Sequence, residues 1–370
     1  MRVLHVEGGR HLHGGAYQVL HLTKGLAARG YESLLVCPRG SELAAAAQPF
    51  ADVREMTMHG DLDPSITMRL AGLLREVRPD LVHLHSRIGA DTWGGIAARL
   101  AGLPTVHTRR VDNPEPRWLV ALKYRLHDRV VAISEEIGRV LISEGLPVQK
   151  LRVVRSAVDW ERWAPPCDRQ RAATLLGVPA DSILICVVSQ LIERKGHRFL
   201  IDVLPTIASR HPNLKVFFFG RGPLEGALRE AIEAAGLNGV VKLGGFRNDL
   251  EKILGCFDLL VHPATMEGLG VSLLQAASAG VPIVASRVGG IPEAVRDRES
   301  GILIEPGDSR ALCTAIETLL ADADRRRAMG DEGRRLMATR FPIDSMVEGN
   351  LRVYTELLAE RNRRPRDNAE

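Results

Sequence analysis

The feature that most constrains the fold is a repeated alternation of short apolar runs with longer amphipathic stretches. Amphipathic stretches such as residues 17–30 have helical spacing. Apolar strands that alternate with helices form a parallel sheet covered on both faces. The first half is therefore predicted to be a doubly wound α/β domain. Its predicted strands lie at residues 2–7, 33–37, 53–58, 81–85, 105–109, 129–134 and 151–158.

The same alternation begins again in the second half. Residues 158–172, VDWERWAPPCDRQRA, contain Pro165–Pro166 and several charges, which is typical of a linker. A chain of 370 residues is also too long for one ordinary core. We expect an α/β fold with two doubly wound, Rossmann-like parallel-sheet domains that face a cleft, because such sheets bind ligands beyond the carboxyl ends of their strands. The second series of strands lies at residues 183–190, 215–220, 240–245, 258–263 and 282–286, and the domains span residues 1–164 and 165–341.

Composition excludes several classes of protein. A net charge of +4 and an aromatic content of 4% do not indicate nucleic-acid binding. No apolar run approaches the ~20 residues of a membrane span. The N-terminal segment does not resemble a signal peptide, because Glu7 and glycines interrupt its apolar stretch. Five scattered cysteines without a CxxC pair fit a reducing cytoplasm and argue against a structural zinc site.

Glycine turns follow several of the predicted strands. Gly14 and Gly15 open a helix after the first strand, although the spacing is not that of a dinucleotide-binding GxGxxG motif. Arg194 and Lys195 precede Gly196 at a second helix start, where two cations and free N–H groups suit a diphosphate. A tight turn or a solvated charged turn remains the alternative at each place. Further glycine turns lie at residues 220–222, 268–271 and 288–290.

The stretch MEGLGVSLLQAASAG places an acid at the beginning of a helix. Glu267 precedes Gly268 and Gly270, and its carboxylate can accept hydrogen bonds from two vicinal hydroxyls. Gln275 follows eight residues later, roughly 80° around the helix from Glu267. Four polar glycine turns in one domain together predict an edge that binds phosphate and sugar.

These motifs together resemble the GT-B-fold retaining glycosyltransferases of family 4, also called glycosyl transferases group 1, over nearly the whole chain. In the second half the resemblance rests on Lys195-Gly196, His262-Pro263, Glu267-Gly268-Leu269-Gly270, and residues 279–284 and 289–293. In the first half it rests on Gly14-Gly15-Ala16, His107 and residues 132–134.

The resemblance implies roles for individual residues. His107 and Glu267 would contact the transferred sugar as the catalytic centre. The chain departs from the family at Gln275, which replaces a ribose-binding glutamate, and at Gln190, which replaces an arginine whose charge Arg194 is expected to supply. No cofactor and no metal is implied, and UDP is favoured over GDP. The implied donor-binding set is Gly14, Gly15, Gln190, Arg194, Lys195, Gly222, Phe246, Gly268, Leu269, Gly270, Val271 and Gln275.

The implied function is transfer of a sugar from a nucleoside diphosphate sugar to a glycan or glycolipid acceptor, in the synthesis of cell-surface polysaccharide or lipopolysaccharide. Two alternatives stay open. They are a catalytically idle nucleotide-sugar binder, because Gln190 and Gln275 both weaken the donor site, and a GT-B-like nucleotide-sugar epimerase. Residues 342–370 are expected to form a helix that packs back on the first domain and ends in a frayed tail.

Residues 107–129 form a basic amphipathic stretch that we expect on the acceptor side. Its apolar residues have helical spacing, with cations on other faces, and such a helix can lie on an anionic membrane. An ordinary core-packing helix is the alternative. We expect a cytoplasmic protein that contacts the anionic inner membrane peripherally and binds no nucleic acid. The predicted acceptor or membrane contacts are Arg109, Arg110, Arg117, Trp118 and Lys123.

Two patterns could suggest a metal but are interpreted otherwise. Asp61 and Asp63 form an Asp-x-Asp pair in a loop before a helix, where a capping role is expected. His83 and His85 alternate on one strand and face the same side, but the sequence offers no apparent third ligand.

Overall fold

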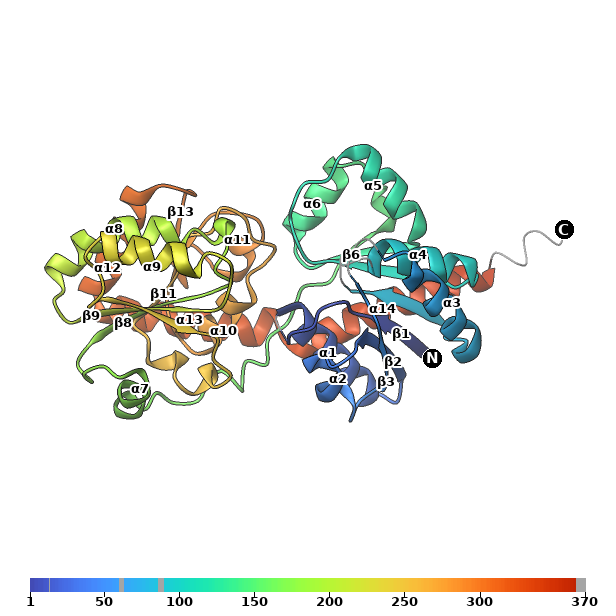
Figure 1. The fold of residues 1–370 in the computed structure, drawn as a ribbon, viewed down its shortest axis with the longest axis horizontal. Helices are drawn as coiled ribbons and strands as arrows, with labels where there is room; N and C mark the ends of the chain where they lie inside the picture. The colour runs from blue at the N-terminus through green and yellow to red at the C-terminus, as the bar shows by residue number, and fades with distance from the viewer. Residues whose placement is uncertain (13, 60–62, 86–89, 364–370) are drawn as a thin grey trace. The chain divides into compact units, whose positions relative to one another are not determined.

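The computed structural model describes residues 1–12, 14–59, 63–85 and 90–363, and the chain divides into two compact units (Figure 1). The first unit contains Met1–Ala157 and Ile343–Glu370, and the second contains Val158–Pro342. Residues 158–164, which the sequence analysis placed in the first domain, belong to the second unit. The frayed tail expected at residues 364–370 lies outside the described residues.

The first unit is built on a seven-stranded parallel sheet with the order β3-β2-β1-β4-β5-β6-β7. Its inner strands are almost entirely buried, as expected where both faces of a sheet are covered, whereas the edge strands β3 and β7 are partly exposed. The strand order reverses between β1 and β4, the place where sheets of this kind bind ligands. The strands are β1 (Arg2–Val6), β2 (Glu32–Pro38), β3 (Asp52–Met56), β4 (Leu81–Leu84), β5 (Thr105–Arg109), β6 (Arg129–Ala132) and β7 (Leu151–Val153).

Helices cover both faces of this sheet. The described helices are α1 (Gly14–Ala27), α2 (Glu42–Ala47), α3 (Ser65–Val77), α4 (Ala90–Leu100), α5 (Arg117–Lys123), α6 (Glu135–Ser143) and α14 (Ile343–Arg363). The last helix of the chain, α14, packs on α1, where a Cβ added to Gly25 would lie 2.4 Å from Val347. Tyr354 of α14 is fully buried in the same core. This helix therefore belongs to the first unit although it follows the second in sequence.

Asp63 binds the first turn of α3. Its carboxylate accepts a hydrogen bond from the Ser65 backbone N–H at 3.2 Å and pairs with Arg69 at 2.9 Å. Asp63 thus has the capping type of role that the sequence predicted, whereas residues 61 and 62 lie outside the described residues.

The second unit has a six-stranded parallel sheet with the order β10-β9-β8-β11-β12-β13. Its strands are β8 (Ile183–Val188), β9 (Leu214–Phe219), β10 (Val241–Gly245), β11 (Leu259–His262), β12 (Ile283–Ser286) and β13 (Gly301–Ile304). Its helices are α7 (Arg169–Leu176), α8 (His197–Arg210), α9 (Glu225–Ala234), α10 (Val271–Ser278), α11 (Ile291–Ala294), α12 (Ser309–Ala321) and α13 (Ala323–Arg340). The prediction of two doubly wound parallel sheets is confirmed, but strand β13 was missed.

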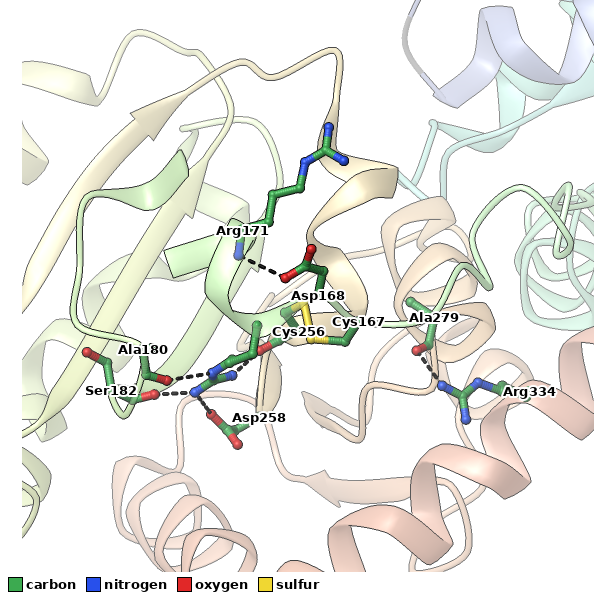
Figure 2. Close-up of a disulfide and its surroundings, with 10 residues drawn as sticks. Cys167, Asp168, Arg171, Ala180, Ser182, Cys256, Asp258, Ala279 and Arg334 are labelled. Carbon is green, nitrogen blue, oxygen red and sulfur yellow. Dashed lines mark hydrogen bonds and ion pairs between the residues drawn. A yellow bond between two sulfur atoms is a disulfide. The ribbon is translucent and has the colours of Figure 1, made fainter. Parts of the chain in front are cut away.

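A disulfide joins Cys167 to Cys256 across 89 residues of sequence (Figure 2). Next to it, Arg169 donates hydrogen bonds to the backbone carbonyl of Cys256 and to the Asp258 carboxylate, the latter at 3.2 Å. The spacing of the cysteines did not predict this pair, and a reducing compartment would not favour it. The disulfide fixes the segment before α7 to the turn that leads into β11.

In the described part of the chain, no helix combines the length and the apolar character needed to cross a bilayer.

Candidate functional site

Tight glycine contacts join the loops at the carboxyl edge of the second sheet. Gly220, after β9, lies so close to the Ser189 carbonyl that an added Cβ would be 1.9 Å from it. The Gly220 N–H also donates to the Gly245 carbonyl at 2.8 Å. Gly196 has a φ of 67°, and a Cβ there would lie 1.9 Å from the Pro263 carbonyl. Only glycine fits both places, because a side chain would collide with backbone.

Glu267 stands at the centre of this edge. Its Oε2 atom lies 2.5 Å from Nζ of Lys195 and 2.9 Å from Nε2 of His262. Its Oε1 atom accepts a hydrogen bond from the Gly268 backbone N–H at 3.1 Å. The three side chains are 14%, 10% and 1% exposed, respectively. The carboxylate is thus fixed in place by three donors.

These contacts determine the charge of Glu267. Burial alone would raise the pKa of Glu267, but the His262 hydrogen bond and the Lys195 charge outweigh it and hold the pKa well below the usual glutamate range. Burial lowers the pKa of His262, although Glu267 opposes that shift. At neutral pH the group is therefore a carboxylate between a lysine cation and a neutral imidazole.

Helix α10 begins directly after this acid. Gly270 has a φ of 83°, and the first N–H groups of α10 have no acceptor within the helix. Leu269 is 1% exposed and anchors the loop in the core. Gln275 is half-buried, and its neighbours in the sequence, Leu274 and Ala276, are fully buried. Within the described structure the side-chain amide of Gln275 makes no hydrogen bond. An amide in this position can bind a polar group of a ligand.

The other predicted donor residues of the second half lie in the same loops. Gln190 is exposed, and the Arg194 carbonyl accepts from the Thr265 N–H at 2.9 Å. A Cβ at Gly222 would lie 2.3 Å from the Leu191 carbonyl. Phe246 is 37% exposed, and the guanidinium carbon of Arg221 lies 5.5 Å from its ring centroid. Sequence reasoning missed His262 as a partner of Glu267 and Arg221 as a partner of Phe246.

In the first unit, Gly14 and Gly15 begin α1 beside Arg110. A Cβ at Gly15 would lie 3.3 Å from Cδ of Arg110. Nearby, His5 of β1 pairs in register with His83 of β4, and His85 lies two residues further on the same face. These three buried histidines could hold a metal ion, so the expectation that no third ligand accompanies His83 and His85 was wrong.

Hydrogen bonds account for the arrangement of these histidines. Arg110 has only donors, so its 3.3 Å contact makes Nδ1 of His85 an acceptor and places the hydrogen on Nε2, which faces Nδ1 of His5 at 3.0 Å. Both ring nitrogens of His83 are also engaged, by Tyr354 at 2.5 Å and Thr108 at 2.7 Å. The lone pairs of the histidine ring nitrogens therefore accept hydrogen bonds. A metal ion could bind Nδ1 of His85 only by displacing Arg110 from it.

His107 faces the opposite side of β5 from Thr108 and is 0% exposed. Its ring stacks on that of His127 at 5.0 Å, and neither of its ring nitrogens has a hydrogen-bond partner among the described residues. Burial, with nearby cations, lowers the pKa of His107 well below the usual histidine value. His107 is thus a neutral imidazole shielded from ligands in this conformation, and its predicted contact with the sugar stays a prediction.

Two of the predicted acceptor or membrane contacts are buried instead. Arg109 is 1% exposed and pairs with Glu115 at 2.9 Å. Lys123 is 7% exposed and pairs with Asp91 at 2.6 Å. Charges removed from water need partners, so Arg109 joins β5 to the loop before α5, Lys123 joins α5 to α4, and neither cation faces a membrane. This corrects the sequence-based assignment of Arg109 and Lys123.

The outer side of α5 has the opposite character. Trp118 and Leu122 are 70% and 60% exposed, and Arg117 and Arg125 are exposed beside them. Val120 of α5 is 0% exposed, so the helix packs one side on the core while Trp118 and Leu122 stay exposed, and both interpretations of residues 107–129 remain open.

Comparison with known proteins assigns both halves of the chain. Residues 12–162 match the family described as Glycosyltransferase Family 4, and residues 168–336 match Glycosyl transferases group 1. A D-inositol 3-phosphate glycosyltransferase of Salinispora arenicola is 30% identical over 313 residues, which cover 76% of this chain and 69% of that protein.

Solved structures share the fold. HepE of Anabaena, in complex with UDP-glucose, superposes with a TM-score of 0.86 at 21% identity, over 96% of this chain and all of that one. WaaG, a glycosyltransferase involved in lipopolysaccharide biosynthesis, has a TM-score of 0.73 at 17% identity, over 96% and 99% of the two chains. The chain therefore belongs to the family 4 glycosyltransferases, also described as glycosyl transferases group 1, and is an enzyme of GT-B fold.

Proposed function

We propose that this glycosyltransferase transfers a sugar, with retention of anomeric configuration, from a nucleoside diphosphate sugar to a glycan or glycolipid acceptor, with UDP favoured over GDP. The observation that carries the proposal is the fixed carboxylate of Glu267 between Lys195 and the first turn of α10. The Glu267 carboxylate can accept hydrogen bonds from sugar hydroxyls, and the Lys195 ammonium beside it can donate hydrogen bonds to a phosphate. Recognition of a sugar joined to a diphosphate requires both.

The chemistry follows from these contacts. The Lys195 ammonium has three donors, so it can keep Glu267 and also bind a phosphate oxygen. The free N–H groups of α10 would hold the charge that builds on the departing diphosphate. Glu267 would accept hydrogen bonds from sugar hydroxyls, and Gln275 from the ribose. Arg194 would supply the cation that is absent at Gln190.

In this proposal the diphosphate charge is held by Lys195, Arg194 and backbone N–H groups, so we expect activity without a divalent metal. His107 could contact the sugar only if the residues that cover it move, because it is 0% exposed.

Two observations support the acceptor assignment, whereas the HepE complexes with UDP and UDP-glucose concern the donor. WaaG acts in lipopolysaccharide biosynthesis. The exposed Trp118 and Leu122, with Arg117 and Arg125 beside them, suit peripheral contact with an anionic membrane. A role in lipopolysaccharide or polysaccharide synthesis at the cytoplasmic face of the inner membrane fits this surface.

The test is a thermal-shift comparison of UDP, GDP and ADP, followed by incubation with the sugar of the preferred nucleotide with and without EDTA. We expect UDP to raise Tm most, because ligands that bind the native state stabilise it. We also expect donor consumption that survives EDTA. Binding without donor consumption with any acceptor would indicate an idle binder, and isomerised donor would indicate an epimerase.

A further inference from the structure

Arg110 carries a charge that makes no ion pair within the described residues, although the carboxylate of Glu7 is near enough to act on it. Within the described ranges the guanidinium has no carboxylate ion-pair partner, and its one hydrogen bond goes to the neutral ring of His85. Its Nε–H group is buried without an acceptor. The neighbouring Arg109, in contrast, is paired with Glu115 at 2.9 Å. A half-buried cation without an anion in direct contact is costly, and an anionic ligand would relieve that cost.

The position of Arg110 is suited to a ligand. It lies against Gly15 at the start of the 14-residue helix α1 and lines a shallow pocket, whose empty volume of about 240 Å³ is mostly open solvent, so that a ligand would bind at its mouth. Arg155 is a second cation in the lining, which contains no carboxylate among the residues described. The Ser156 hydroxyl in this pocket is buried and has no partner. The wall is therefore positive and rich in donors.

The protonation state agrees with this geometry. Burial lowers the pKa of Arg110 to about 10, and the nearby charge of Glu7 acts in the opposite direction. Arg110 is thus still a cation at neutral pH. Arg155 already pairs with Glu135 at 2.9 Å, which leaves Arg110 as the principal cation for a ligand.

We propose that this pocket of the first unit binds a phosphate group carried by the acceptor, with Arg110 as its main partner and Ser156 as a further donor. The identity of the ligand as the acceptor rests on the proposed function. The phosphate could belong to a soluble phosphorylated sugar or to a lipid headgroup, and the two sources share this chemistry.

The test measures binding to the full chain with its donor site filled by saturating UDP. The probes are inorganic phosphate, glucose 6-phosphate, and phosphatidylcholine vesicles with and without phosphatidylglycerol. The variants are Arg110→Gln, Arg110→Lys, and Arg75→Gln as a matched control, because Arg75 is an exposed arginine of α3 in the same unit and lies outside the pocket lining. A lost charge-assisted hydrogen bond should weaken binding about tenfold or more in Arg110→Gln. Arg75→Gln should bind as the wild type does, and the affinity of Arg110→Lys should lie between those of Arg110→Gln and the wild type.

Loss of glucose 6-phosphate binding in Arg110→Gln would support a soluble phosphorylated acceptor. Loss of binding to anionic vesicles alone would support a lipid headgroup. Equal affinities of Arg110→Gln and the wild type for every probe would overturn the proposal. So would phosphate binding that disappears in Lys195→Ala and not in Arg110→Gln, since the anion would then occupy the donor site. Failure of the proposed function can be distinguished from failure of this phosphate site. If the proposed function is wrong, neither the wild type nor any variant would bind UDP.

Discussion

Replacing Glu267 by glutamine tests the centre of the proposed site with the smallest change in shape. Oε2 of Glu267 faces two donors, Lys195 and His262, and Oε1 faces a third, the Gly268 N–H. An amide has one oxygen, so its NH₂ group must face at least one of these donors. We expect the amide oxygen to stay toward the lysine and the histidine, and the bond from Gly268 to be lost. The cost should be about 1–3 kcal/mol of unfolding free energy, the usual cost of a buried donor without an acceptor.

Glu267→Gln should also reduce the turnover rate. If Glu267 holds the sugar most strongly in the transition state, kcat should drop on the order of 10²-fold, or ~2.7 kcal/mol of activation free energy. UDP affinity should stay within about threefold, because Lys195 remains free to bind phosphate. Calorimetry with UDP and initial rates of donor consumption measure the two quantities. Near-normal turnover, or a loss of UDP binding as large as the loss of turnover, would refute the role assigned to Glu267.

The pH dependence of the same pair gives an independent check. The pKa of Glu267 is depressed in the folded state, so its contribution to stability is present above the unfolded value of about 4.3 and is lost as pH falls through the folded pKa. The difference in unfolding free energy between wild type and Glu267→Gln should therefore be constant from about pH 6 to 8 and shrink below about pH 4.3. A difference that changes near neutral pH would mean that another group is responsible.

Four further predictions concern single residues. Lys195→Ala should weaken UDP binding by about 1.5–3 kcal/mol in calorimetry, the value of a charged hydrogen bond. Gln275→Leu should weaken UDP binding by about 1–3 kcal/mol, and an unchanged affinity would make Gln275 a packing residue. Cys167→Ser should lower the free energy of unfolding by about 2–4 kcal/mol, and dithiothreitol should lower that of the wild type by the same amount. Cys313→Ser is the control and should leave the free energy of unfolding unchanged, because Cys313 is a free cysteine. Burial lowers the pKa of His127 to about 3, so stability should fall as pH drops from about 6.5 toward 3, and His127→Phe should reduce that slope by up to about 1.4 kcal/mol per pH unit.

Local sequence determined the layers of this protein and most of the donor edge. Short apolar runs and the helical stretches between them specify two parallel sheets, because helices cover both faces of such strands. Gly196 and Gly220 mark places where backbone meets backbone, a requirement that only glycine meets. Lys195 and Glu267 could be predicted as neighbours because each follows a strand of the same sheet, and such strand ends meet at one edge.

Tertiary structure decided which charged and polar groups face each other. His5 joins His83 because β1 and β4 are neighbours in the sheet although 78 residues apart, as the pair Arg2 and Asp80 also shows. Cys167 reaches Cys256 across 89 residues for the same reason. Arg109 and Arg110 are adjacent in sequence, yet Arg109 pairs with Glu115 whereas Arg110 makes no ion pair with any carboxylate that the structure describes. Successive residues of a strand point to opposite faces, so the partner of each was fixed only when the helices packed on the sheet.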